Sequence, residues 1–223
     1  MFPFCRKVEN VKVELFDWPT EPWKTNDHTQ FGGTVQLGVV TVETDQGVIG
    51  NSFLGSSRVG ANHHAPGLIE FIKPIIVGRN PLDIGAIWQD MWKMNRSVST
   101  YVIAAIDVCL WDINGKIANQ PIHRLIGTYK ETAPVYSSTA YHATKEEYAE
   151  EAIKFKEMGW TAHKIHPHGE PKYDVEICKA VREAVGDDMK LMLDSMWSYQ
   201  YLSLIHISEP TRPRLISYAV FCL

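Results

Sequence analysis

The carboxyl-terminal half of the sequence alternates between short apolar or β-branched segments and longer amphipathic ones. The predicted order is strand 133–138, helix 144–158, strand 161–166, helix 174–185 and strand 189–194. Strands that alternate with helices in this way form βαβ units, whose strands are parallel. Both faces of a parallel sheet need cover, and only three strands are present. We therefore predict an unfinished parallel α/β domain.

Residues at the ends of the two predicted helices support this assignment. Thr144 and Glu147 have the spacing of a capping box, in which both side chains bond free backbone amides of the first helical turn. Gly159 and Gly186 follow the two helices at the position where a glycine commonly ends a helix.

The amino-terminal part has the pattern of an antiparallel sheet followed by helices. The predicted elements are strands 8–16, 35–44 and 48–53, a tight turn at 45–47, and helices 64–76, 82–94 and 100–118. We therefore predict an α+β first domain. Segment 18–33, which contains proline, glycine and asparagine, is predicted to be a long loop. A loop of this length is typical of a binding loop or a lid.

Composition excludes several classes of protein. The 223 residues include 22 basic and 26 acidic side chains without a basic block, which argues against nucleic-acid binding. Apolar stretches are interrupted, as by Glu70, Lys73 and Pro74, and fall short of the ~20 residues that span a bilayer. The four cysteines are scattered, unlike those of a zinc knuckle or a disulfide scaffold. We expect a cytoplasmic protein that binds neither membranes nor nucleic acids.

The final 22 residues, 202–223, resemble a translated sequencing adapter. Segments 202–212 and 216–223 match two parts of one adapter in the same frame, and the three residues between them fill the space of a variable index. A natural strand or tail is the alternative. We predict that the native sequence stops at or near Tyr201 and exclude 202–223 from fold reasoning.

Candidate chemistry lies in the segment His-Lys-Ile-His-Pro-His, at the end of the predicted strand 161–166. Side chains alternate along a strand, so Lys164 and His166 share one face and His163 lies on the other. Catalytic groups of a parallel barrel lie on the inward face at the carboxyl ends of strands. A zinc patch and a solvated basic strand end are alternatives, although no cysteine or second histidine pair has zinc-ligand spacing.

A second candidate is Asp194, which ends the apolar strand 189–194. A strand buried on both faces should be continuously apolar, so a terminal carboxylate indicates one of two roles. Asp194 is either the N-cap of a following helix or a site residue.

Residues 105–127 resemble a signature of the enolase superfamily, in its mandelate racemase and muconate lactonizing enzyme branch. The matching positions are Asp107, Leu110, Trp111, Asp112, Gly115, Lys116, Pro121, Leu125 and Gly127. The resemblance implies an α+β capping domain over 1–130 and the first three strands of an incomplete (β/α) TIM-like barrel over 131–201. Residues 202–223 would then be the non-native tail.

The same resemblance assigns roles to three residues. The second barrel strand of the family ends in Lys-x-Lys, and here it reads Lys164-Ile-His166. The third strand ends in the first of three carboxylates that hold Mg²⁺, which corresponds to Asp194. The family often has Asp-x-Asn there, whereas this chain has Met196 in the third position. The resemblance implies that Lys164 stabilises an enolate and His166 removes a proton α to a carboxylate.

By this resemblance the parent protein is a Mg²⁺-dependent enzyme, and an acid-sugar dehydratase is the favoured reaction. Its substrate would be a small carboxylate such as a sugar acid, and the parent would be a homo-oligomer. A racemase, epimerase or cycloisomerase of the same superfamily is an alternative. The chain as given has one expected metal ligand and three strands of a barrel, so we expect the chain itself to be an inactive fragment of the parent enzyme. A non-enzymatic fragment that binds nothing is the remaining alternative.

Overall fold

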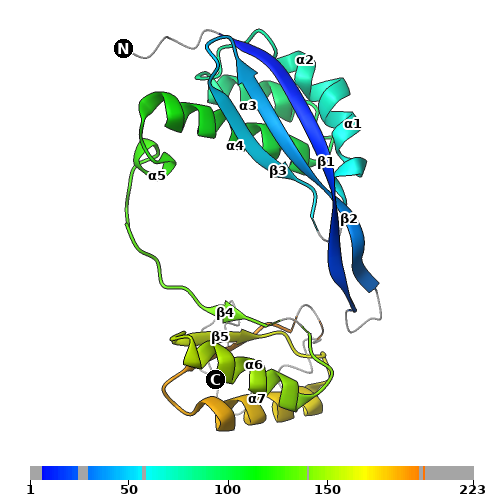
Figure 1. Cartoon of the computed structure of the whole chain (residues 1–223), viewed down its shortest axis with the longest axis vertical. Helices are drawn as coiled ribbons and strands as arrows, with labels where there is room; N and C mark the ends of the chain where they lie inside the picture. Colours follow the sequence, from blue (N-terminus) through cyan, green and yellow to red (C-terminus); the bar gives the residue numbers. More distant parts are fainter. Residues whose placement is uncertain (1–6, 25–29, 57–58, 140, 196–197, 199–223) are drawn as a thin grey trace, which may run out of the picture. The chain divides into compact units, whose positions relative to one another are not determined.

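The computed structural model describes residues 7–24, 30–56, 59–139, 141–195 and 198. These residues fall into two compact units (Figure 1). The first unit lies within residues 1–22 and 31–131, and the second within 23–30 and 132–223. The run 202–223, predicted to be an adapter-encoded tail, lies outside the described residues. Among the described helices, none is both long and apolar enough to cross a membrane.

The first unit contains a three-stranded sheet in the order β1-β2-β3. The strands are β1 (Val8–Lys24), β2 (Gln30–Thr44) and β3 (Ile49–Leu54). Strands β2 and β3 are antiparallel, with Gly38 opposite Leu54 and Glu43 opposite Ile49. Gly47 adopts a φ of 74° in the connecting turn, which glycine does without strain. The antiparallel meander predicted from the sequence is confirmed.

The predicted long loop at 18–33 is wrong. Strand β1 continues to Lys24 and β2 begins at Gln30, so most of this segment is strand and residues 25–29 lie outside the description. Pro19 and Pro22 suggested a loop, but β1 is an edge strand, because β2 is its one neighbour among the described strands. An edge strand tolerates proline because part of its backbone has no ladder partner to lose.

Helical segments follow the sheet. They are η1 (Ala61–His63), α1 (Ala65–Gly67), η2 (Leu68–Ile72), α2 (Lys73–Ile76), α3 (Ile84–Trp92), α4 (Thr100–Ala118) and α5 (Ile122–Leu125). The helix predicted at 64–76 is interrupted by η2, which is a π-helical turn. Pro74 follows that turn and has no amide to donate, which favours a wider turn before it. The structure adds α5, which the sequence pattern did not predict.

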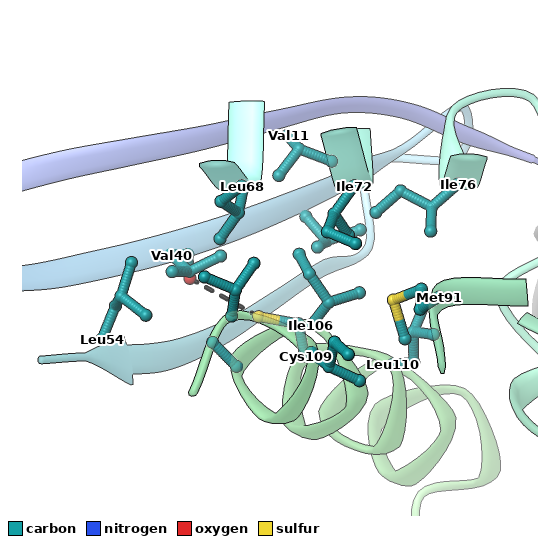
Figure 2. Packing of buried hydrophobic residues seen from close by; sticks show 14 of the residues in the cluster. Val11, Val40, Leu54, Leu68, Ile72, Ile76, Met91, Ile106, Cys109 and Leu110 are labelled. Carbon is teal, nitrogen blue, oxygen red and sulfur yellow. Dashed lines mark hydrogen bonds between the residues drawn. The ribbon is translucent and has the colours of Figure 1, made fainter. Parts of the chain in front are cut away.

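The helices pack on one face of the three-stranded sheet and enclose an apolar core (Figure 1). Figure 2 shows this core, in which Ile106, Cys109 and Leu110 of α4 lie against side chains from the sheet and from the other helices. The Cys109 thiol donates a hydrogen bond to the carbonyl of Val40, at 3.6 Å. Burial raises the pKa of Cys109 to about 11, so this thiol is an unreactive packing group.

Residues of the 105–127 motif form hydrogen bonds that join helix α4 to β3. The Asp112 carboxylate accepts the backbone N–H of Asn51 at 2.9 Å and the Lys116 ammonium at 2.7 Å. Lys116 also donates to the carbonyl of Ile49 at 2.7 Å. The approach is close enough that a Cβ on Gly50 would lie 2.1 Å from the Cys109 carbonyl oxygen. The motif is therefore architectural in this structure.

We predict that Gly50→Ala destabilises the first unit by roughly 3 kcal/mol, because the backbone of α4 must move to admit the new methyl group. Chemical denaturation of the 223-residue chain, followed by circular dichroism, measures this change. Gly85→Ala on α3 is the matched control, since its Cβ meets nothing within 4 Å. Equal free energies of unfolding for the two variants would contradict the close packing of α4 on β3.

The second unit contains a parallel sheet in the order β4-β5-β6. The strands are β4 (Ser137–Ser138), β5 (Ala162–Ile165) and β6 (Lys190–Leu193). In its register, Lys164 lies opposite Ser138 on one side and Met192 on the other. The parallel sheet was predicted correctly, although the strand predicted at 133–138 is reduced to two residues. The antiparallel and parallel sheets together agree with an α+β domain followed by part of a barrel.

Helices α6 (Lys145–Glu157) and α7 (Pro171–Val185) lie together on one face of the parallel sheet (Figure 1). The predicted capping box is confirmed, because Thr144 accepts the amide of Glu147 and Glu147 accepts the amide of Thr144. At the other end Gly159 has a φ of 90° and donates to the carbonyl of Lys156. Trp160 donates to the carbonyl of Phe155, which completes a Schellman motif.

A histidine lies inside the core of the second unit. His163 of β5 is fully buried, and its Nδ1 is 2.8 Å from the hydroxyl of Ser137. Its Nε2 has no hydrogen-bond partner among the described residues. Burial lowers the pKa of His163, while Glu151 of α6 acts to raise this pKa and His142 acts to lower it further. The ring is therefore neutral in the folded unit near pH 7.

We predict that the second unit loses stability as the pH falls below about 6.5, the ordinary value for histidine. The unfolded chain binds a proton at His163 more readily than the folded chain, because burial lowers the pKa in the folded state. Hydrogen exchange of the amides in α6 and β5, corrected for intrinsic rates, measures this loss between pH 7 and pH 5.

The matched variant is His163→Phe, which keeps an aromatic ring beside Phe155 and removes the titration. Its exchange protection should change less between the two pH values. An unchanged pH dependence in this variant would contradict a role for His163.

Candidate functional site

The candidate site lies at the carboxyl ends of β4, β5 and β6. Lys164 belongs to β5, His166 follows β5, and Asp194 follows β6. The Lys164 ammonium lies 3.2 Å from Asp194 Oδ2, and His166 Nε2 lies 3.5 Å from the same oxygen. The structure therefore brings together all three residues that the sequence singled out. Their roles stay predictions.

These three side chains are partly buried but remain accessible to solvent. The side chains of Lys164 and His166 are 21% and 18% exposed, and that of Asp194 is 40% exposed. The ammonium of Lys164 also lies over the ring of Tyr136, 5.5 Å from its centroid. Partial shelter strengthens electrostatic interactions relative to those at a fully hydrated surface. A small anion at this edge would meet the ammonium and the imidazole, and also the negative charge of Asp194.

The hydrogen bonds of His166 define which ring nitrogen can act as a base. Its Nδ1 lies 2.9 Å from the backbone carbonyl oxygen of Thr139. A carbonyl oxygen can only accept, so Nδ1 carries the proton and donates it to Thr139. In the neutral ring the lone pair is then on Nε2, as a general base requires. Asp194 Oδ2 lies 3.5 Å from this nitrogen, and the two groups form an ion pair only when the ring is protonated.

The backbone of His166 is held from two sides. Its N–H donates to the hydroxyl of Thr139 at 3.0 Å, and its carbonyl accepts the hydroxyl of Tyr148 at 2.7 Å. Tyr148 lies on α6 and is fully buried, and burial raises its pKa to about 12. Sequence reasoning missed both residues. A polar run, Ser137-Ser138-Thr139, at the end of a predicted strand was the available signal for Thr139.

The histidines of segment 163–168 do not converge as a zinc patch would. His163 is buried in the core, His166 faces Asp194, and His168 Nε2 donates to the carbonyl of His142 at 2.6 Å. Within the described ranges, no group of three or more His, Cys, Asp or Glu side chains could hold a metal ion. The alternative role of Asp194 as a helix N-cap involves residues outside these ranges.

Magnesium fits this donor set only in part. Asp194 offers a carboxylate oxygen, the ligand type that Mg²⁺ prefers, but Mg²⁺ needs near-octahedral oxygen coordination. The neighbouring groups in the described part of the chain are an ammonium and an imidazole, and Lys164 pairs with Asp194 directly. The described residues therefore do not form a complete magnesium site.

Family models match both parts of the chain. Residues 9–127 match the mandelate racemase / muconate lactonizing enzyme N-terminal domain. Residues 147–213 match the enolase C-terminal domain-like family. The second match includes residues 202–213, the first part of the run that resembles an adapter.

Individual relatives have several activities. D-xylonate dehydratase of Haloferax volcanii is 34% identical over 77% of this chain and 47% of its own length. N-succinyl-L-Arg/Lys racemase of Bacillus cereus is 35% identical over 70% of this chain and 43% of its own length. Further relatives include an arabinonate dehydratase, a hydrophobic dipeptide epimerase and a D-galactarolactone cycloisomerase. The chain spans less than half the length of the first two relatives.

A solved structure gives the same result. The racemase from Streptomyces coelicolor with bound magnesium is 25% identical, with a TM-score of 0.81. The match covers 90% of this chain and 58% of that one. Together with the family match over residues 9–127, this shows that the chain belongs to the mandelate racemase / muconate lactonizing enzyme family of the enolase superfamily.

Proposed function

We propose that this chain is part of a longer, Mg²⁺-dependent enzyme that removes the proton α to a carboxylate. The observation that carries the proposal is the convergence of Lys164, His166 and Asp194 at the carboxyl end of a parallel sheet. Asp194 would be one magnesium ligand, and the others would come from parts of the enzyme outside the described residues. A magnesium-containing racemase among the structural relatives supports this use of the metal.

Lys164 and His166 have complementary tasks in this proposal. His166 Nε2 takes the proton, and the electron pair of the broken C–H bond moves into the substrate carboxylate as an enolate. The Lys164 ammonium lies beside the developing charge, where a fixed cation stabilises it more than water does. The Lys164 ammonium lies 3.2 Å from Asp194 Oδ2, so it is held at the same edge of the sheet as the proposed metal ligand.

Dehydration of an acid sugar is the reaction we favour. After proton removal, the enolate electrons expel the β-hydroxyl group, which takes the proton now carried by His166 and leaves as water. This step needs a base on one face of the substrate, and His166 supplies one. The D-xylonate and arabinonate dehydratases among the relatives support a sugar acid as the substrate.

Racemisation or epimerisation is the second candidate. The same enolate would be reprotonated on its opposite face, which requires a second acid on that face. The racemase that is 35% identical to this chain supports this alternative. Lys164 and His166 lie on the same side of β5, so a second acid would come from another strand.

In the complete enzyme, His166→Asn should lower exchange of the substrate α-proton with deuterium by about 10²-fold to 10⁴-fold, the usual contribution of a general base. Substrate binding should be largely kept, because the amide conserves size and polarity. Lys164→Met should lower turnover of every substrate. Exchange monitored by NMR and steady-state kinetics give both quantities.

His123→Asn is the matched control for the histidine substitution, since His123 is exposed and lies in α5 of the first unit. It should leave exchange unchanged. Normal exchange in His166→Asn with all α-epimers would show that His166 is a structural residue and that the base lies elsewhere.

For the 223-residue chain alone, we predict no saturable Mg²⁺ binding at micromolar concentration. One carboxylate that already pairs with an ammonium does not replace the tightly held water of Mg²⁺. Isothermal titration calorimetry with MgCl₂ should give the same trace for the natural chain and for Asp194→Asn. A saturable signal that Asp194→Asn abolishes would overturn this prediction.

A further inference from the structure

The hydrogen bonds between the ends of β4 and β5 depart from a regular parallel ladder. The N–H of Thr139 donates to the carbonyl of Lys164 at 2.9 Å, as a parallel ladder requires. The next bond of such a ladder would join the N–H of His166 to the carbonyl of Thr139. Instead, this N–H donates to the Thr139 hydroxyl, at 3.0 Å.

Because the His166 N–H donates to the Thr139 hydroxyl, the Thr139 carbonyl is available to the imidazole. The carbonyl oxygen lies 2.9 Å from His166 Nδ1, whereas the Ser138 hydroxyl is 3.5 Å from the same nitrogen. Thr139 is therefore the closer of the two acceptors. Thr139 is 5% exposed, so water competes little for these bonds.

We propose that Thr139 is a positioning residue that sets the tautomer of His166. Its hydroxyl takes the ladder bond of His166, so its carbonyl can hold Nδ1–H and keep the lone pair on Nε2. Tyr148 assists from α6 by fixing the carbonyl of His166 through a 2.7 Å hydrogen bond. The inference concerns how His166 is held and rests on the proposed function for its catalytic meaning.

The structure also indicates how loss of the hydroxyl would act. In Thr139→Val, the His166 N–H has lost its acceptor, and the Thr139-position carbonyl is the nearest replacement because a regular ladder uses it. The N–H and the imidazole then compete for one carbonyl. The Nδ1–H tautomer loses its advantage over the Nε2–H tautomer, whose N–H can point to Asp194 Oδ2 at 3.5 Å.

The test is NMR of the 223-residue chain labelled with ¹⁵N-histidine at pH 8, above the ordinary histidine pKa of about 6.5. The ¹⁵N shifts distinguish the two tautomers, and His166→Asn identifies the signals of His166. The natural chain should hold His166 mainly as the Nδ1–H tautomer. Thr139→Val should move the ratio of tautomers by about fivefold toward Nε2–H, the size expected from one neutral hydrogen bond.

Thr139→Ser is the matched control, because it keeps the hydroxyl and should keep the tautomer ratio of the natural chain. Equal ratios in Thr139→Val and Thr139→Ser would overturn the proposal. Should Thr139→Val fail to fold, the natural chain still decides, because a predominantly Nε2–H ring at His166 would overturn the proposal on its own.

Activity of the complete enzyme separates this inference from the proposed function. If His166→Asn leaves α-proton exchange unchanged while Thr139→Val shifts the tautomer, the proposed function fails and the positioning role stands. If His166→Asn abolishes exchange but Thr139→Val leaves the ratio of His166 tautomers unchanged, the positioning role fails. When the proposed function and the positioning role both hold, Thr139→Val should lower kcat with little change in KM. Thr139→Ser should have the kcat of the natural enzyme.

Discussion

The parallel register of β4, β5 and β6 determines where every side chain of the candidate site lies. Because Lys164 lies between Ser138 and Met192, the residues that follow each strand meet at one edge of the sheet. Asp194 extends this register by donating its N–H to the carbonyl of Ile165. A shift of one residue in β6 would carry the carboxylate to the opposite face, away from Lys164 and His166.

The same strand serves two different environments. Lys164 points to the polar edge of the site, whereas its neighbour His163 points into the core formed with α6 and α7. The charged side chain at the site and the neutral side chain in the core thus belong to adjacent residues. Strand alternation makes this separation sharp, because consecutive side chains leave the sheet on opposite faces.

The sequence predicted what depends on local pattern and missed what depends on neighbours. The alternation of side chains along a strand located Lys164 and His166. Asp194 was located by the apolar strand that it ends. The loop predicted at 18–33 failed because the cost of proline depends on whether a strand has one neighbour or two, which a local pattern does not record. The role of Thr139 also escaped, since its bonds run to a residue 27 positions away and one of them uses a backbone carbonyl.

The unusual ladder at Thr139 has an evolutionary consequence. A lysine at position 166 would have no ring nitrogen to orient, so the carbonyl at position 139 could return to the regular ladder and the hydroxyl would be dispensable. A histidine at 166 gains from the hydroxyl directly. Among relatives with one or the other base, a histidine at 166 would then be accompanied by a hydroxyl at 139, whereas a lysine at 166 would leave position 139 free to vary.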